Sequence, residues 1–203
     1  MHPVQRDPYL RLVNGAIDAY TESGYDGTGV KEIAAHADSC KQSFYKNFAN
    51  RSACFIDAYE TVVGRIADAV RAAVATDAPW LEQLRAGLDA VLALIEENPG
   101  YVRIVLIEPS GAGPWATKHH RSRLDLLPPL LDAARALSPD GADLPERTGT
   151  IALGSAVTML IDEYRAGFSR STAELAHDLY FALLMPYVGP GDATRMAAEA
   201  YAT

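Results

Sequence analysis

The chain has 203 residues, of which 49% are hydrophobic and 22% charged, and its formal net charge is −8. This balance is typical of a folded globular chain and argues against intrinsic disorder, and no apolar run approaches the ~20 residues that a membrane-spanning helix needs. The acidic charge does not exclude nucleic acid as a partner, because residues 1–51 hold six Lys or Arg and six Asp or Glu and are therefore neutral.

Residues 1–8, MHPVQRDP, contain no apolar stretch that would serve as a secretory signal, and we expect a short flexible arm there. The two cysteines, Cys40 and Cys54, are too few for a disulfide framework or a structural zinc site. We therefore expect a cytoplasmic protein with free thiols and neither a metal nor a cofactor.

Helical spacing begins directly after the arm. One face of the first helix carries the apolar residues Leu12, Val13, Ala16, Ile17 and Tyr20. We expect this helix to end at Gly24, because glycine adopts the left-handed conformation of a helix end freely.

Two shorter helices are expected next, from Val30 to Ala37 and from Lys41 to Phe48. Gly29 would cap the first of them, with Glu32 at its N3 position, and Phe44 and Phe48 would anchor the second. The three residues between them are too few for an antiparallel hairpin. The two helices must therefore cross steeply, as in a helix-turn-helix.

Beyond residue 50 the helices become longer, and no segment has the alternating pattern of a strand. We expect one helix capped by Asn50 and others over residues 81–95, 101–108, 115–137 (broken at Pro128-Pro129), 145–168, 172–188 and 193–202. The sequence therefore predicts an all-α chain of nine or ten helices, with a helix-turn-helix domain over residues 1–50 and a helical ligand-binding and dimerisation domain over residues 51–203.

Three pieces of the N-terminal region carry a family resemblance: Gly24-Tyr25, TGVKEIA at residues 28–34, and FYKNF at residues 44–48. With their spacing, residues 12–59 resemble the TetR family of transcriptional repressors. The resemblance implies a homodimer that places two recognition helices on a near-palindromic DNA site, with a small ligand bound in the C-terminal domain.

The third helix is the expected recognition helix, since Phe44 and Phe48 leave its other side open. By resemblance, Gln42, Ser43 and Tyr45 lie in or beside the major groove, where glutamine pairs with adenine and serine reaches base edges or a phosphate. Basic and hydroxyl side chains nearby suit phosphate contacts. The DNA-binding residues predicted in this way are Thr28, Lys41, Gln42, Ser43, Tyr45, Lys46, Asn47 and Arg51.

The turn departs from the usual pattern of the family. Asp38 replaces a glycine, Ser39 a valine, Cys40 a cap serine, and Asn47 a common histidine. Ser39 and Gln42 have the spacing of a capping box, which would start the helix one residue early and engage Gln42. Cys40 near a helix N-terminus permits either a redox-sensitive thiol or a simple replacement of serine.

Polar residues also interrupt the apolar stripes of the second domain, as they do in small-ligand sites. The alternative is that they are surface residues, interface residues or paired core groups. Metal binding at His119-His120 is not expected, because adjacent histidines diverge on a helix. The predicted ligand contacts are Tyr59, Arg103, Glu108, Trp115, His119, Thr158 and Asp162.

The two late helices are apolar on more than one side, which implies burial against a partner. The resembled family dimerises through such a pair of helices. The expected interface residues are Leu153, Val157, Leu160, Ile161, Leu175, Leu179 and Leu183.

No nucleophile elbow, glycine-rich phosphate loop or HExxH motif occurs, so we expect no catalytic residue and no enzyme activity. The resemblance implies a DNA-binding regulator, a repressor released by a small apolar or amphipathic ligand. The alternative is a dimer of the same fold that binds a ligand or a partner and has weakened DNA binding.

Overall fold

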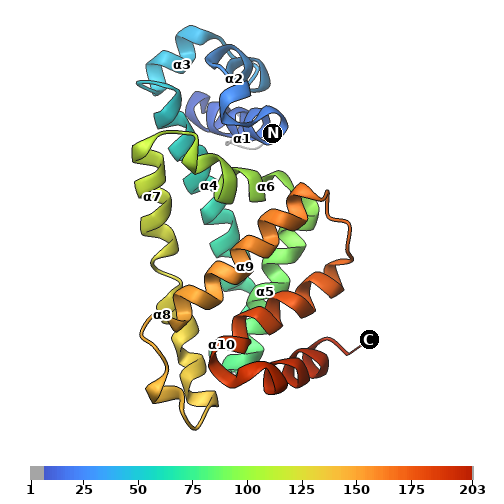
Figure 1. Ribbon diagram of the computed structural model, residues 1–203. Coiled ribbons are helices and arrows are strands. Elements are labelled where there is room, and N and C mark those ends of the chain that lie inside the picture. Colours follow the sequence, from blue (N-terminus) through green and yellow to red (C-terminus); the bar gives the residue numbers. More distant parts are fainter. Residues whose placement is uncertain (1–6, 203) are drawn as a thin grey trace. The chain divides into compact units, whose positions relative to one another are not determined.

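The computed structural model describes residues 7–202, and within that range it contains α-helices α1 to α10, short π and 3-10 segments, and no strand (Figure 1). The expected all-α class is confirmed. Most of the expected N-terminal arm, residues 1–6, lies outside the described range. In the described part, no helix is long and apolar enough to cross a membrane.

The chain forms two compact units. Unit 1 comprises Met1–Ala67 and Asn98–His120, and unit 2 comprises Asp68–Glu97 and Arg121–Thr203. The expected boundary at residue 50 therefore falls inside unit 1. The N-terminal helices share unit 1 with the first part of the long helix that begins at Arg51 and with residues 98–120. Sequence periodicity gives no sign of either association.

Unit 1 begins with α1 (Pro8–Gly27), α2 (Val30–His36) and α3 (Lys41–Asn47). Asp7 caps α1 by accepting a hydrogen bond from the Tyr9 N–H, and the five predicted core residues of α1 are buried. Gly24 breaks the regular winding of α1 with φ 72° and ψ 177°, at the predicted helix end. Glu32 accepts from the Gly29 N–H at 3.0 Å, as expected for the first turn of α2.

The other elements of unit 1 come from two parts of the chain. Asn50 caps α4 (Arg51–Ala73) through the Ala53 N–H, and the buried side of α4 includes Phe55 and Tyr59. Residues after 98 form α6 (Gly100–Val102), a π segment η2 (Arg103–Ile107), a 3-10 segment η3 (Glu108–Ser110) and the first residues of α7 (Pro114–Leu124). The expected helix over 101–108 is thus present, with a π turn that its periodicity did not indicate.

Unit 2 contains α5 (Trp80–Glu97), α8 (Pro128–Leu131), the 3-10 segments η4 (Asp132–Leu137) and η5 (Gly141–Asp143), α9 (Thr148–Arg165) and α10 (Thr172–Ala200). Helix α10 packs against α5 and α9, and its buried residues include Leu179 and Leu184. The helical stretch expected over residues 115–137 is divided into α7, α8 and η4, and α8 begins at the Pro128-Pro129 pair. Within α10, Gly189 has φ 79°, so the winding breaks next to the predicted end at residue 188.

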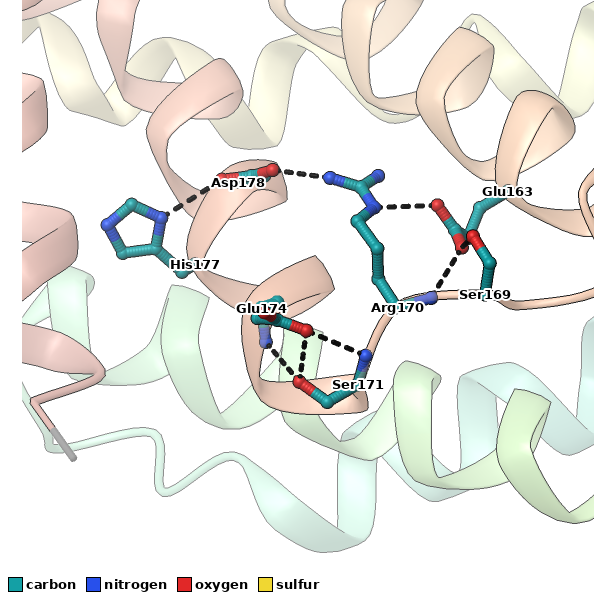
Figure 2. Close-up of polar contacts among 7 residues, drawn as sticks. All are labelled: Glu163, Ser169, Arg170, Ser171, Glu174, His177 and Asp178. Carbon is teal, nitrogen blue, oxygen red and sulfur yellow. Dashed lines mark hydrogen bonds and ion pairs between the residues drawn. The ribbon is translucent and has the colours of Figure 1, made fainter.

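A polar network closes the turn between α9 and α10, as Figure 2 shows. The Glu163 side chain is only 5% exposed, and its carboxylate accepts from Arg170 Nε at 2.8 Å, the Arg170 backbone N–H at 3.1 Å and the Ser169 hydroxyl at 3.3 Å. The Arg170 guanidinium also donates to Asp178. Hydrogen bonds from Arg170 hold the pKa of Glu163 below its usual value. A buried carboxylate is tolerated here because all of these donors converge on it.

Candidate nucleic-acid interface

Helix α3 is anchored on one side by aromatic residues. Phe44 is 0% and Phe48 3% exposed, and their ring centroids lie 5.3 Å apart. Tyr9 of α1 stacks on Phe48 at 5.4 Å, and its hydroxyl donates to Asp57 of α4. The two phenylalanines are the anchors that the sequence predicts, and they join α3 to the rest of unit 1.

The opposite side of α3 is polar and open. Tyr45 is 61% exposed, and Lys41, Gln42, Lys46 and Asn47 are also exposed, while Ser43 is half-buried. The Asn47 amide donates to the Ser43 carbonyl within the helix, at 2.8 Å. The structure thus brings six of the eight predicted DNA-binding residues together on one short helix, with two lysines to favour phosphate.

The turn before α3 follows the sequence prediction in one respect and departs from it in another. Asp38 has φ 45°, the left-handed conformation expected where the family usually has glycine. The predicted capping box of Ser39 and Gln42 is not formed, however. Cys40 is the N-cap residue, without a side-chain cap hydrogen bond, and α3 begins at Lys41. Gln42 is therefore not engaged in a cap.

Two of the predicted phosphate contacts, Thr28 and Arg51, have hydrogen-bond partners within unit 1. Thr28 is 0% exposed, and its hydroxyl donates to the Ala19 carbonyl at 3.0 Å. Arg51 donates to the carbonyls of Tyr25 at 2.9 Å and Thr28 at 2.7 Å, and its guanidinium lies over the Tyr25 ring at 4.0 Å. Thr28 cannot reach a phosphate through its side chain, and Arg51 braces the α1–α2 turn.

The two cysteines differ in their surroundings. Cys40 is exposed, whereas Cys54 is buried, as predicted, and burial raises the pKa of its thiol to about 12. A thiol with such a pKa is almost entirely protonated at neutral pH and hence unreactive.

Three of the predicted ligand contacts lie together where α4 meets α7 within unit 1. The buried Tyr59 packs against His119 and shares a hydrogen bond of 3.1 Å with Nδ1 of His120. His119 pairs with Glu60, and the exposed Trp115 lies against the His119 ring. Burial lowers the pKa of His120, which favours its neutral form.

The remaining predicted ligand contacts lie elsewhere. Arg103 and Glu108 form an ion pair that also binds the backbone at the end of α1, a paired arrangement whose partners the sequence did not reveal. In unit 2, Thr158 and Asp162 are exposed on α9, where Thr158 donates to the Gly154 carbonyl and Asp162 pairs with Arg165.

The expected interface residues divide into two sets. Leu175, Leu179 and Leu183 are 3%, 0% and 7% exposed and belong to the core of unit 2, so the chain itself covers them and the expectation is wrong for these three. Leu153, Val157, Leu160 and Ile161 are half-buried. The large apolar side chains that are exposed on α9 and α10 are Ile151, at 55%, and Met185, at 37%.

Residues 12–58 match the family model of bacterial regulatory proteins of the tetR family. The N-terminal segment of the chain is therefore similar to the helix-turn-helix region of tetR-family regulators. The rest of the chain lies outside this match. The chain is 25% identical over 95 residues to the HTH-type transcriptional activator FasR of Mycolicibacterium smegmatis, a match covering 47% of this chain and 43% of that relative. The matched segment thus spans less than half the length of FasR.

Solved structures of low sequence identity share the fold. The fatty acid degradation regulator FadR of Bacillus halodurans is 16% identical (TM-score 0.73, covering 92% of this chain and 96% of that one). FadR of Bacillus subtilis, solved with stearoyl-CoA, is 15% identical (TM-score 0.69, covering 89% of this chain and 98% of that one). AibR, solved with isovaleryl coenzyme A and operator DNA, is 19% identical (TM-score 0.69, covering 91% of this chain and 99% of that one).

Proposed function

We propose that this chain is a TetR-family regulator, a cytoplasmic homodimeric repressor that binds a near-palindromic operator through α3 and releases it when an acyl-CoA binds. The observation that carries the DNA-binding part is the division of α3 into a buried aromatic side, Phe44 and Phe48, and an exposed polar side around Tyr45. In this proposal Gln42, Ser43 and Tyr45 contact bases, and Lys41, Lys46 and Asn47 contact phosphates.

The ligand class is proposed from the two neighbours solved with acyl-CoA thioesters, stearoyl-CoA and isovaleryl-CoA. Tyr59, Trp115 and His119 are the proposed contacts, because they lie together and join polar atoms to aromatic surface. For the dimer, the exposed Ile151 and Met185 support an interface on α9 and α10 that includes Val157 and Ile161. To shift the equilibrium, the ligand must bind the released state more tightly than the operator-bound state.

The DNA-binding proposal is tested with duplexes selected by the protein from a random-sequence pool. Fluorescence anisotropy gives the affinity for the selected duplex and for a scrambled one, at several salt concentrations. Tyr45→Ala should reduce the preference for the selected duplex, by about tenfold if a base contact is lost. Lys46→Ala should weaken both duplexes alike and lower the salt slope by about 1. Arg195→Gln, on α10 of unit 2, is the matched control.

A dimer with weakened DNA binding is the second candidate, favoured by the exposed Asp38 next to α3 and by the neutral charge of residues 1–51. This second candidate predicts weak binding to every duplex, unchanged by Tyr45→Ala.

The ligand part of the proposal is tested with stearoyl-CoA and isovaleryl-CoA as probes. Displacement of the selected duplex by one of them, reduced in Tyr59→Ala, supports release by ligand, and no displacement contradicts it.

A further inference from the structure

The segment from Gly100 to Ser110 changes its winding twice, from α to π at Arg103 and from π to 3-10 at Glu108. In the π turn, the Glu108 N–H donates to the Arg103 carbonyl, five residues back. Such turns are rare in proteins, and those that occur often lie at functional sites. This one lies in unit 1, together with the helix-turn-helix.

The π turn brings Arg103 and Glu108 together. On an α-helix, two residues five positions apart point about 140° away from each other. Here Nε of Arg103 lies 2.8 Å from Oε1 of Glu108, with the two side chains 27% and 14% exposed. The pairing therefore depends on the winding between the two residues.

The pair binds backbone groups near the end of α1. Arg103 Nη1 donates to the carbonyls of Thr21 at 3.4 Å and Glu22 at 3.2 Å, and Glu108 Oε2 accepts from the Tyr25 N–H at 2.9 Å. A cation thus faces helix C-terminal carbonyls, and an anion faces a backbone N–H. Both contacts have the favourable polarity.

Close packing fixes the same contact. A Cβ atom on Gly24 would lie 2.3 Å from Nη2 of Arg103, and one on Gly100 would lie 1.9 Å from Cγ2 of Thr21. Only glycine permits both approaches. The Tyr25 carbonyl in turn accepts from Arg51, which also holds Thr28 just before α2. Contacts therefore run without a gap from the π turn to the start of α2.

We propose that Arg103 and Glu108 are positioning residues for the helix-turn-helix, and that the π turn between them sets its position by holding the end of α1. A change to α winding moves Glu108 away from Arg103 and releases the Tyr25 N–H. The inference rests on the proposed function, since α3 must bind DNA for its position to matter.

The experiment uses the full chain and four variants: Glu108→Ala, Glu108→Gln, the exchange Arg103→Glu with Glu108→Arg, and the control Arg195→Gln. Amide hydrogen exchange at Tyr25 reports the clamp, anisotropy with the selected duplex reports DNA binding, and thermal unfolding confirms that each variant is folded. Glu108→Ala removes a negative charge, so electrostatics alone would tighten DNA binding. We expect the opposite, a severalfold loss of affinity and about tenfold faster exchange at Tyr25.

Glu108→Gln keeps an acceptor for the Tyr25 N–H, and we expect it to retain part of both properties. The exchanged pair restores the opposite charges but places a carboxylate against carbonyls and a cation against an N–H, so it should not rescue either. Rescue by the exchanged pair, or unchanged affinity in Glu108→Ala with faster Tyr25 exchange, would overturn the positioning role. If the native chain binds no duplex while its Tyr25 amide is protected, the proposed function fails first, and the positioning role fails with it.

Discussion

The turns that join α2 to α3 and α9 to α10 share one backbone feature, but different chemistry holds them in place. Each turn contains a non-glycine residue with positive φ, Asp38 at 45° in the first and Phe168 at 53° in the second. Buried aromatic rings hold α3 in place, whereas a buried carboxylate with three donors ties the α9–α10 turn together. Because α3 is anchored by apolar side chains, its polar side chains stay exposed. In the α9–α10 turn, by contrast, the polar side chains bind one another.

The largest expected effect is that of Phe44→Ala. Phe44 is fully buried, and loss of its ring leaves a cavity under α3 that should lower the free energy of unfolding by about 4 kcal/mol. Tyr45→Ala, one position along and exposed, is the matched control and should change stability by less than about 0.5 kcal/mol. Denaturant unfolding measures both, and equal losses would contradict the two-sided description of α3.

Glu163→Gln should have the next largest effect. The change removes the charge that pairs with the Arg170 guanidinium, and we expect a loss of about 2 kcal/mol because hydrogen bonds to charged groups are lost or weakened. Glu199→Gln, which removes an exposed partner of Arg195 on α10, should have no measurable effect on the same unfolding curve. If the two variants behave alike, Glu163 does not hold the turn.

Sequence periodicity was enough to predict the aromatic anchor of α3, but it could not predict the ionic contacts of the α9–α10 turn, and the reason is physical. Phe44 and Phe48 are four positions apart, so one helical face brings them together whatever the rest of the chain does. Glu163 meets Arg170, which also pairs with Asp178, only after the positive-φ turn at Gly167, and Arg103 meets Glu108 only through a π turn. Periodicity also gave no sign of the contacts of Thr28 and Arg51, since the Ala19 and Tyr25 carbonyls that they bind are brought near them by the fold of α1.

Acid provides a second measure of the ionic anchor. Hydrogen bonds from Arg170 hold the pKa of Glu163 below its ordinary value near 4.5. The ionised, folded form is therefore favoured above that pH, and its contribution to stability is lost as the pH falls from 4.5 through the lowered pKa. The unfolding midpoint of the native chain should fall more steeply below pH 4.5 than that of Glu163→Gln. Parallel profiles would contradict this assignment.

The smallest expected effects come from the turn residues themselves, where the two regions should respond with opposite sign. Asp38→Gly relieves the left-handed backbone strain of an exposed residue and should raise stability by about 0.5 kcal/mol. Phe168→Gly relieves the same strain but removes a ring that packs on the core of unit 2 and contacts Tyr164, so it should lower stability by about 1 kcal/mol. Urea midpoints of the two variants measured side by side decide the matter, because a shared sign would mean that backbone conformation, and not what each side chain contacts, sets the stability of both turns.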